Sequence, residues 1–213
     1  MRWPGGELRK LVTVVIPSIP LRAYGGMKTR PSMLRRAIES VLAQDCHTIG
    51  LQTPFIESVI DHERRGAGHT RHKALMRVST PWVAFLDDDD ELLPQHVRRC
   101  YEHALDTGAD YVYPWFEVIG GSDPFPQHFG RPFDPADPVQ TTVTTFVRTA
   151  LAQDIGFVFD LDPKQLVGGQ SWGEDYEFTR RCVAAGAKVA HLPERTWLWH
   201  HHGANTSGRP DRW

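Results

Sequence analysis

Short apolar runs alternate with amphipathic segments along the first half of the chain, and this alternation constrains the fold more than any other feature. The run at 11–16, Leu-Val-Thr-Val-Val-Ile, is rich in β-branched residues and stops at Pro17, so it predicts a buried strand. The segment 32–44 repeats its apolar residues at helical spacing, which predicts an amphipathic helix. Repeated strand–helix units predict an α/β fold with a Rossmann-like, mostly parallel central sheet flanked by helices.

The second half of the chain is less regular, and the residues 120–138, rich in Gly, Pro and Asp, predict an exposed excursion. Strands are expected at 11–16, 55–60, 82–86, 111–116, 141–147, 188–192 and 196–200, and helices at 32–44, 69–78, 94–105 and 174–185. The length of 213 residues suits a single domain covering 1–213, with a polar tail at 208–213.

Charge and cysteine content exclude several classes of protein. The formal net charge of −2 provides no global positive field for nucleic acid or anionic membranes. The three cysteines form no CxxC pair, which argues against a zinc knuckle or a disulfide framework and favours reduced thiols in the cytoplasm. The N-terminus lacks the apolar stretch of a signal peptide, and no segment has the length of a membrane span, so no integral membrane association is expected.

Five adjacent acidic residues, Asp87 to Glu91, directly follow the apolar run 82–86. Such carboxylates repel one another unless a cation or solvent screens them, and Mg²⁺ and Mn²⁺ prefer oxygen ligands. Pro17 and Asp61 also lie at the expected ends of strands, and ligands bind at this edge of a parallel sheet. The run therefore predicts a metal site in a shared crevice. The alternative is a solvated acidic turn that caps the helix near Pro94.

Four features resemble glycosyltransferases with the GT-A fold, especially the inverting enzymes of family 2. Phe85-Leu-Asp-Asp-Asp-Asp-Glu-Leu92 resembles their Asp-x-Asp motif, and the segment 66–75 resembles their Gly-x-x-x-Ala-Arg-Asn-x-Ala-Leu segment. Gly173-Glu-Asp-Tyr-Glu177 resembles their Glu-Asp motif, and the segment 202–207 resembles their C-terminal histidine segment. With the opening strand, the resemblance spans residues 11–207. It implies a nucleotide-binding half at about 11–116 and an acceptor and catalytic half at about 117–207.

The resemblance implies a metal-dependent enzyme that moves a sugar from a nucleotide-diphosphate sugar, by analogy a UDP-sugar, to an acceptor hydroxyl with inversion. Asp175 is then the general base, with Glu174 beside it in the catalytic motif, and Mn²⁺ or Mg²⁺ neutralises the leaving diphosphate. The implied metal ligands are Asp89, Asp87 and His202, and the implied nucleotide-sugar contacts are Pro17, Ser18, Asp61, Arg71, Asp87 and Asp88.

For several of these residues a purely structural role is the alternative to a role in binding. Arg71 opens a helix and is expected to pair with the diphosphate, whereas Arg64 and Arg65 are expected to be solvated. Asp61-His-Glu-Arg-Arg departs from the family's Asp-Asp-Gly-Ser stretch, so Asp61 is either a base contact or a simple strand-end residue. Trp172 is either a tentative acceptor contact or a loop anchor.

Three consecutive histidines, His200 to His202, leave the metal ligand ambiguous in register. Alternation along a strand points the first and third to the same face, and the resemblance favours His202 with His200 as runner-up. The acceptor is open among a glycan, a protein, a lipid-linked sugar, a small molecule and a modified nucleic acid. Competing hypotheses are a metal-dependent phosphoesterase or nucleotidyltransferase that uses Asp87 to Asp90, and a non-catalytic nucleotide-sugar binder.

Overall fold

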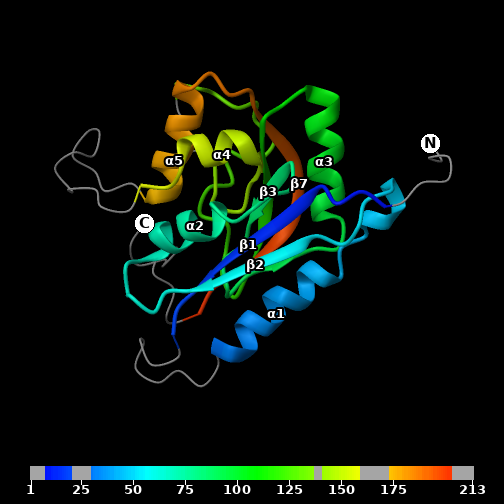
Figure 1. Ribbon diagram of the computed structural model, residues 1–213. Helices are drawn as coiled ribbons and strands as arrows, with labels where there is room; N and C mark the ends of the chain where they lie inside the picture. The colour runs from blue at the N-terminus through cyan, green and yellow to red at the C-terminus, as the bar shows by residue number, and fades with distance from the viewer. Residues whose placement is uncertain (1–7, 21–29, 137–140, 159–172, 203–213) are drawn as a thin grey trace.

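The computed structural model describes residues 8–20, 30–136, 141–158 and 173–202. In these ranges the element order is β1 (Val12–Ser18), α1 (Arg30–Leu42), η1 (Cys46–Ile49), β2 (Phe55–Ile60), α2 (Ala67–Leu75), β3 (Trp82–Phe85), β4 (Glu91–Leu92), α3 (His96–Thr107), β5 (Tyr111–Ile119), β6 (Phe146–Arg148), α4 (Thr149–Ile155), α5 (Glu174–Ala184) and β7 (Val189–His200). The alternation expected from the sequence is thus observed, and Figure 1 shows helices packed around one twisted sheet.

The strands form one mixed sheet in the order β2-β1-β3-β6-β5-β7-β4. β1 pairs in parallel with both β2 and β3, and β5 pairs in parallel with β7. β6 runs antiparallel to β3 and to β5, so those two strands point the same way, and β4 runs antiparallel to β7. Five strands therefore share one direction, and their carboxyl ends lie along the same edge of the sheet. This arrangement confirms the expected α/β fold.

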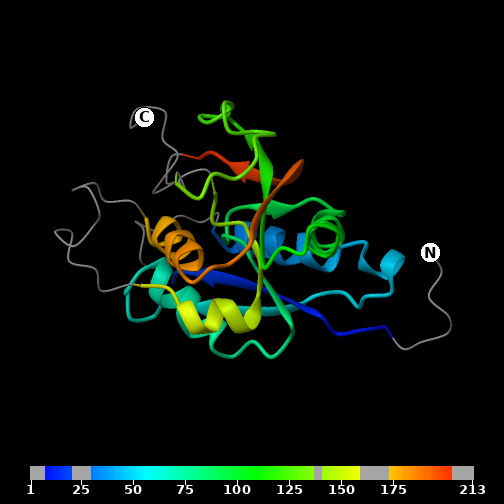
Figure 2. The same cartoon turned by 90° about the horizontal axis from the view of Figure 1, so that it is seen from above.

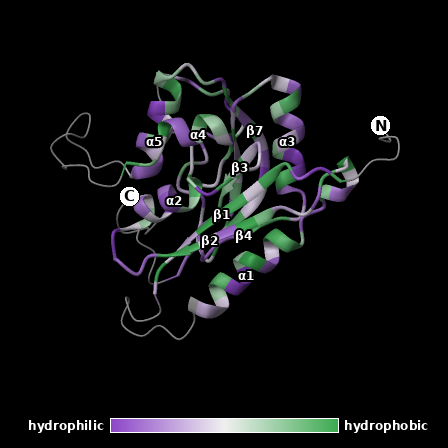
Figure 3. Cartoon of the chain, viewed as in Figure 1, coloured by the Kyte–Doolittle hydropathy of each residue, from purple (hydrophilic) through white to green (hydrophobic). Residues whose placement is uncertain are grey.

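Helices cover both faces of the sheet. Figure 2 shows α1 and α3 on one face and α2 and α4 on the other, and α5 packs on α4. The middle strands are therefore covered on both faces. Figure 3 shows β1 as predominantly hydrophobic, whereas the helices mix hydrophilic and hydrophobic residues. Every residue of β1 is buried, which explains why the strand is mostly apolar, because a strand covered on both faces needs no polar alternation.

Aromatic side chains fill the core on the two sides of β3. Trp82 stacks on Phe146 with ring centroids 4.8 Å apart, on the side of α3. Phe85 points the other way and packs edge-on against Phe157 and Phe178, which stack on each other at 4.4 Å. This second cluster joins the sheet to α5, so the position of the Glu-Asp segment at the start of α5 depends on apolar packing.

Pro17 lies inside β1 without breaking the sheet. The carbonyl of Val15 accepts the N–H of Leu86, on the side of β3, and the carbonyl of Ser18 accepts the N–H of Asp61, on the side of β2. Pro17 follows Val15 by two residues, so its backbone faces the side of β3, which has already ended at Phe85. No ladder hydrogen bond is lost there, which is the position in which a sheet tolerates proline.

Several boundaries differ from the sequence-based expectations. The strand expected at 141–147 forms only at Phe146–Arg148, and the strands expected at 188–192 and 196–200 are one strand, β7. Two register shifts, between Pro114 and Trp115 and between Trp115 and Phe116, accommodate the extra residues of β7. The strand is therefore irregular near Pro193 but does not break there. The short elements β4, α4 and η1 were not anticipated, because such lengths carry little periodicity.

The three cysteines are buried free thiols, as their spacing indicated. None of the helices in the described ranges combines the length and the apolar character needed to cross a bilayer.

Candidate functional site

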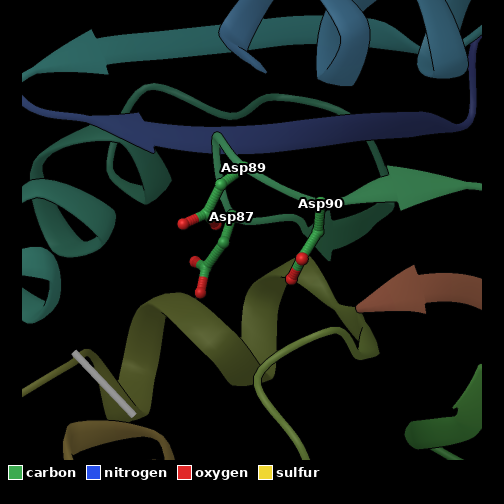
Figure 4. Close-up of side chains that lie close together, drawn as sticks. All are labelled: Asp87, Asp89 and Asp90. Atoms are coloured by element: carbon green, nitrogen blue, oxygen red, sulfur yellow. The ribbon is translucent and has the colours of Figure 1, made fainter. Parts of the chain in front are cut away.

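The site lies at the carboxyl edge of the sheet, where the acidic run follows β3. Ligand oxygens of Asp87, Asp89 and Asp90 all lie within 4.8 Å of one another. Figure 4 shows their side chains projecting from the same side of the turn. Burial, and after it the charges of Asp89 and Asp87, hold the pKa of Asp90 well above its usual range. Crowded carboxylates of this kind favour a hard divalent cation, so the residues present fit Mg²⁺ or Mn²⁺.

The structure places two of the three expected metal ligands, Asp87 and Asp89, in this cluster and adds Asp90. His202 lies beside it, with Nε2 3.0 Å from Oδ2 of Asp89. His200 is engaged elsewhere: its ring nitrogen Nε2 lies 2.6 Å from Oε1 of Glu91, and its backbone N–H donates to Oδ1 of Asp90 at 2.9 Å. The contact with Asp89 therefore distinguishes His202 from the other candidate in the sequence.

Ser18, one of the expected nucleotide contacts, contacts the acidic run directly. Ser18, at the end of β1, donates its hydroxyl hydrogen to Oδ2 of Asp88 at 2.6 Å. Asp88 is 3% exposed, so this hydrogen bond joins β1 to the turn after β3 inside the protein. Pro17 precedes Ser18 in the same buried strand.

Asp61 organises the loop after β2. Its Oδ1 accepts the backbone N–H of Arg65 at 3.0 Å, and its Oδ2 accepts that of Gly66 at 2.8 Å. The loop carries Arg64 at a φ of 57° and Gly66 at 91°, and such positive values favour glycine over other residues. Both carboxylate oxygens thus shape the turn that leads into α2, which is a fuller role than that of a simple strand-end residue.

Arg71 is paired with two carboxylates of the protein itself. Its guanidinium forms ion pairs with Asp87, in the acidic run, and with Glu174, at the start of α5. The side chain of Arg71 is almost completely buried between these two carboxylates. A glycine at position 68 permits the close approach, because a Cβ there would lie 2.9 Å from Cγ of Glu174. No sequence pattern indicates the pairing with Glu174, since it lies 103 residues from Arg71.

Asp175 lies next to that ion pair in the first turn of α5. Its Oδ1 accepts the backbone N–H of Tyr176 at 2.8 Å, which helps to fix the direction of the carboxylate. Burial raises the pKa of Asp175, the neighbouring Glu174 raises it further, and Arg71 opposes the rise. A carboxylate with a raised pKa beside a cluster of charged groups is suited to accept a proton. Trp172, the tentative acceptor contact, lies outside the described residues.

We expect Arg71→Met to lower the free energy of unfolding by about 2–3 kcal/mol, because it leaves two carboxylates without their cation. This value is below that for breaking a fully buried ion pair, since the side chains of Asp87 and Glu174 are 33% and 30% exposed. Urea denaturation measures the change. Arg77→Met is the matched control, because it removes a more exposed pair with Glu57 and should cost only about 0–1 kcal/mol. Equal losses in the two variants would contradict the structural role of Arg71.

The fold and part of the sequence are similar to those of known proteins. The mixed sheet with helices on both faces is the GT-A fold. The chain resembles glycosyltransferases of family 2, because residues 51–154, just under half of its length, match the model of glycosyl transferase family 2. These residues run from the start of β2 to α4 and include the acidic run.

Two curated relatives come from Rhizobium meliloti (strain 1021). Succinoglycan biosynthesis protein ExoO is 24% identical over 78% of this chain and 56% of its own length. Succinoglycan biosynthesis protein ExoW is 31% identical over 56% of this chain and 41% of its own length. The chain thus spans about half the length of these relatives.

Among solved structures, the chain is similar to S. aureus TarS. Residues 1–349 of TarS in complex with UDP-GlcNAc superpose with a TM-score of 0.70 at 14% identity, covering 92% of this chain and 60% of TarS. The complex of the same protein with UDP gives a TM-score of 0.68 at 15% identity, with 90% and 61% covered. At this level of identity the likeness shows a common fold.

Proposed function

We propose that the protein transfers a sugar from a nucleotide-diphosphate sugar to an acceptor hydroxyl, with Asp175 as the general base. The observation that carries the proposal is the pair of contacts made by Arg71, which joins the acidic run at Asp87 to the start of α5 at Glu174. Arg71 thereby brings the acidic run, which is suited to hold a metal ion and a diphosphate, to the same edge of the sheet as Asp175, which is suited to remove a proton.

The donor half of the proposal comprises residues of about 11–116, and the acceptor half those of about 117–207. Asp87, Asp89 and His202 would hold Mn²⁺ or Mg²⁺, with Asp90 as a further carboxylate. A bound cation of this type neutralises negative charge on the departing diphosphate. Ser18, Asp61 and Asp88 would line the nucleotide pocket, while Arg71 holds Glu174 and Asp87 in place and moderates the pKa of Asp175.

Asp175 would take the proton of the acceptor hydroxyl as the hydroxyl oxygen attacks the anomeric carbon. The bond between that carbon and the diphosphate oxygen would break, and the nucleotide diphosphate would leave. One base and no second nucleophile are assigned, which corresponds to a single in-line displacement with inversion of configuration. We propose UDP as the nucleotide, because TarS, which shares the fold, has been crystallised with UDP and UDP-GlcNAc. The acceptor is left open among the classes named above.

A thermal-shift panel tests the donor assignment. UDP, GDP, CDP and TDP are each added with Mn²⁺ or with EDTA, and a ligand that binds the native state raises the melting temperature. We expect UDP with Mn²⁺ to give the largest rise and EDTA to abolish it. If a different nucleotide gives the largest shift, the proposed nucleotide base is wrong but the proposed sugar transfer stands. No shift with any of the four would contradict the proposal and direct attention to phosphoesterase substrates.

A further inference from the structure

One face of α1 carries a row of polar side chains that bind the acidic run and the segment after it. Arg36, Ser40 and Gln44 are spaced four residues apart, so they lie on the same side of the helix and of its C-terminal extension. Ser40 and Gln44 are 9% and 5% exposed, although they belong to a helix that packs against an apolar core. Buried polar side chains on such a helix require partners.

The partners of this row follow one another along the chain. Arg36 donates from Nη2 to the carbonyl oxygen of Asp89 at 2.7 Å. Oγ of Ser40 accepts the backbone N–H of Leu92 at 3.1 Å. The amide of Gln44 donates to the carbonyl of Leu93 at 2.9 Å. The helix therefore holds the main chain from Asp89 to Leu93 at three successive points.

The end of β7 holds the same run from the other side. β4 pairs with β7 through Glu91 opposite Leu198, and the backbone N–H of His200 donates to Asp90. Glu91 joins the two sides, because its Oε1 lies 3.0 Å from Nε of Arg36 and 2.6 Å from Nε2 of His200. The helix α1 and the end of β7, which are far apart in sequence, thus both contact the carboxylate of Glu91.

We propose that Arg36, Glu91 and His200 form a positioning brace that sets the geometry of the cation site, an inference that rests on the proposed function. Arg36 donates to the main-chain oxygen of Asp89, so it fixes this residue through its backbone. Glu91 and His200 fix the end of β7, which in turn sets the distance between His202 and Asp89. Groups that orient metal ligands in this way typically contribute about 10–100-fold to metal affinity.

The test measures Mn²⁺ binding to the full chain directly, by electron paramagnetic resonance of free Mn²⁺ without nucleotide or sugar. We expect Arg36→Gln and Glu91→Gln each to raise the Kd for Mn²⁺ about tenfold or more. Arg36→Lys keeps the charge but lacks the planar group that spans Asp89 and Glu91, so its Kd should also rise. Arg35→Gln is the matched control: the side chain of this neighbour on α1 is 73% exposed and lies 3.9 Å from Glu39 in an exposed pair, so the Kd of the variant should stay at the wild-type value.

Melting temperatures are measured in parallel, and binding is compared well below the lowest of them, so that loss of folded protein does not imitate loss of affinity. If Arg36→Gln and Glu91→Gln lower only the melting temperature and bind Mn²⁺ like the wild type, the brace supports the fold alone and the inference is overturned. If the wild type itself fails to bind Mn²⁺, the metal site of the proposed function fails, and the brace fails with it. The two failures are therefore distinguishable.

Discussion

Replacing Asp175 by Asn is expected to reduce kcat for sugar transfer by about 10²–10⁴-fold, the usual contribution of a positioned general base. Asparagine keeps the size of the side chain and its capacity to accept the N–H of Tyr176, so the start of α5 should stay intact. Binding of UDP should change little, because the acidic run on the other side of Arg71 is untouched. Single-turnover transfer measures the loss of rate, and a UDP titration measures whether binding of the nucleotide is kept.

The pH dependence gives a second readout for the same residue. A general base works in its deprotonated form, so activity should rise with pH through the pKa of Asp175. Burial and Glu174 raise this pKa, so the rise should be centred above the ordinary value for an aspartate. The acid limb of the profile should disappear in Asp175→Asn.

Asp154→Asn provides the control for this experiment, because Asp154 is an exposed carboxylate on α4. Its kcat and pH profile should match those of the wild type. A wild-type rate in Asp175→Asn would show that another group removes the proton. A donor that binds but is never consumed by the wild type would instead favour the non-catalytic binder.

The second large effect concerns Asp89, whose substitution by Asn should remove the stabilisation that UDP provides in the presence of Mn²⁺. In the wild type, UDP at a hundred times its Kd should raise the free energy of unfolding by about 2.7 kcal/mol. In the variant this increment should fall to the value measured with EDTA. Transfer should fall by about 100-fold or more, because a bound cation supplies several kcal/mol of charge stabilisation and each 1.36 kcal/mol is tenfold in rate.

Asp106→Asn removes one negative charge from the exposed side of α3 and controls for the change in net charge. It should leave both the UDP increment and the rate unchanged. Full Mn²⁺-dependent stabilisation in Asp89→Asn would place the essential ligands elsewhere in the acidic run, at Asp87 or Asp90.

The sequence predicted the parts of this protein that depend on local order. The β-branched run before Pro17 and the apolar run before Asp87 each specify a buried strand, and both strands form where they were expected. Their alternation with helices was sufficient to predict a sheet whose carboxyl ends meet at one edge. The acidic run could also be identified from the sequence, since its five residues are neighbours in the chain.

Tertiary structure alone determined which of these residues face one another. Arg71 pairs with both Asp87 and Glu174, and no local pattern links Arg71 to Glu174, which lies 103 positions further along the chain. The three histidines could not be separated by alternation, because two of them share a face of the strand; only their contacts with Asp89 and Glu91 distinguish His202 from His200.

The contacts of α1 could likewise not be predicted from local patterns. Its apolar residues predicted the helix, because their periodicity depends only on neighbouring turns. The function of its polar face depends on a strand and a turn that lie about 50 residues further along the chain, as the separation of 53 residues between Arg36 and Asp89 illustrates. The sequence by itself thus determined the sheet, its helices and the acidic edge, since these follow from short-range periodicity. The long-range hydrogen bonds and ion pairs that arrange this edge as a candidate site arise only when the chain has folded and distant polar groups are buried together.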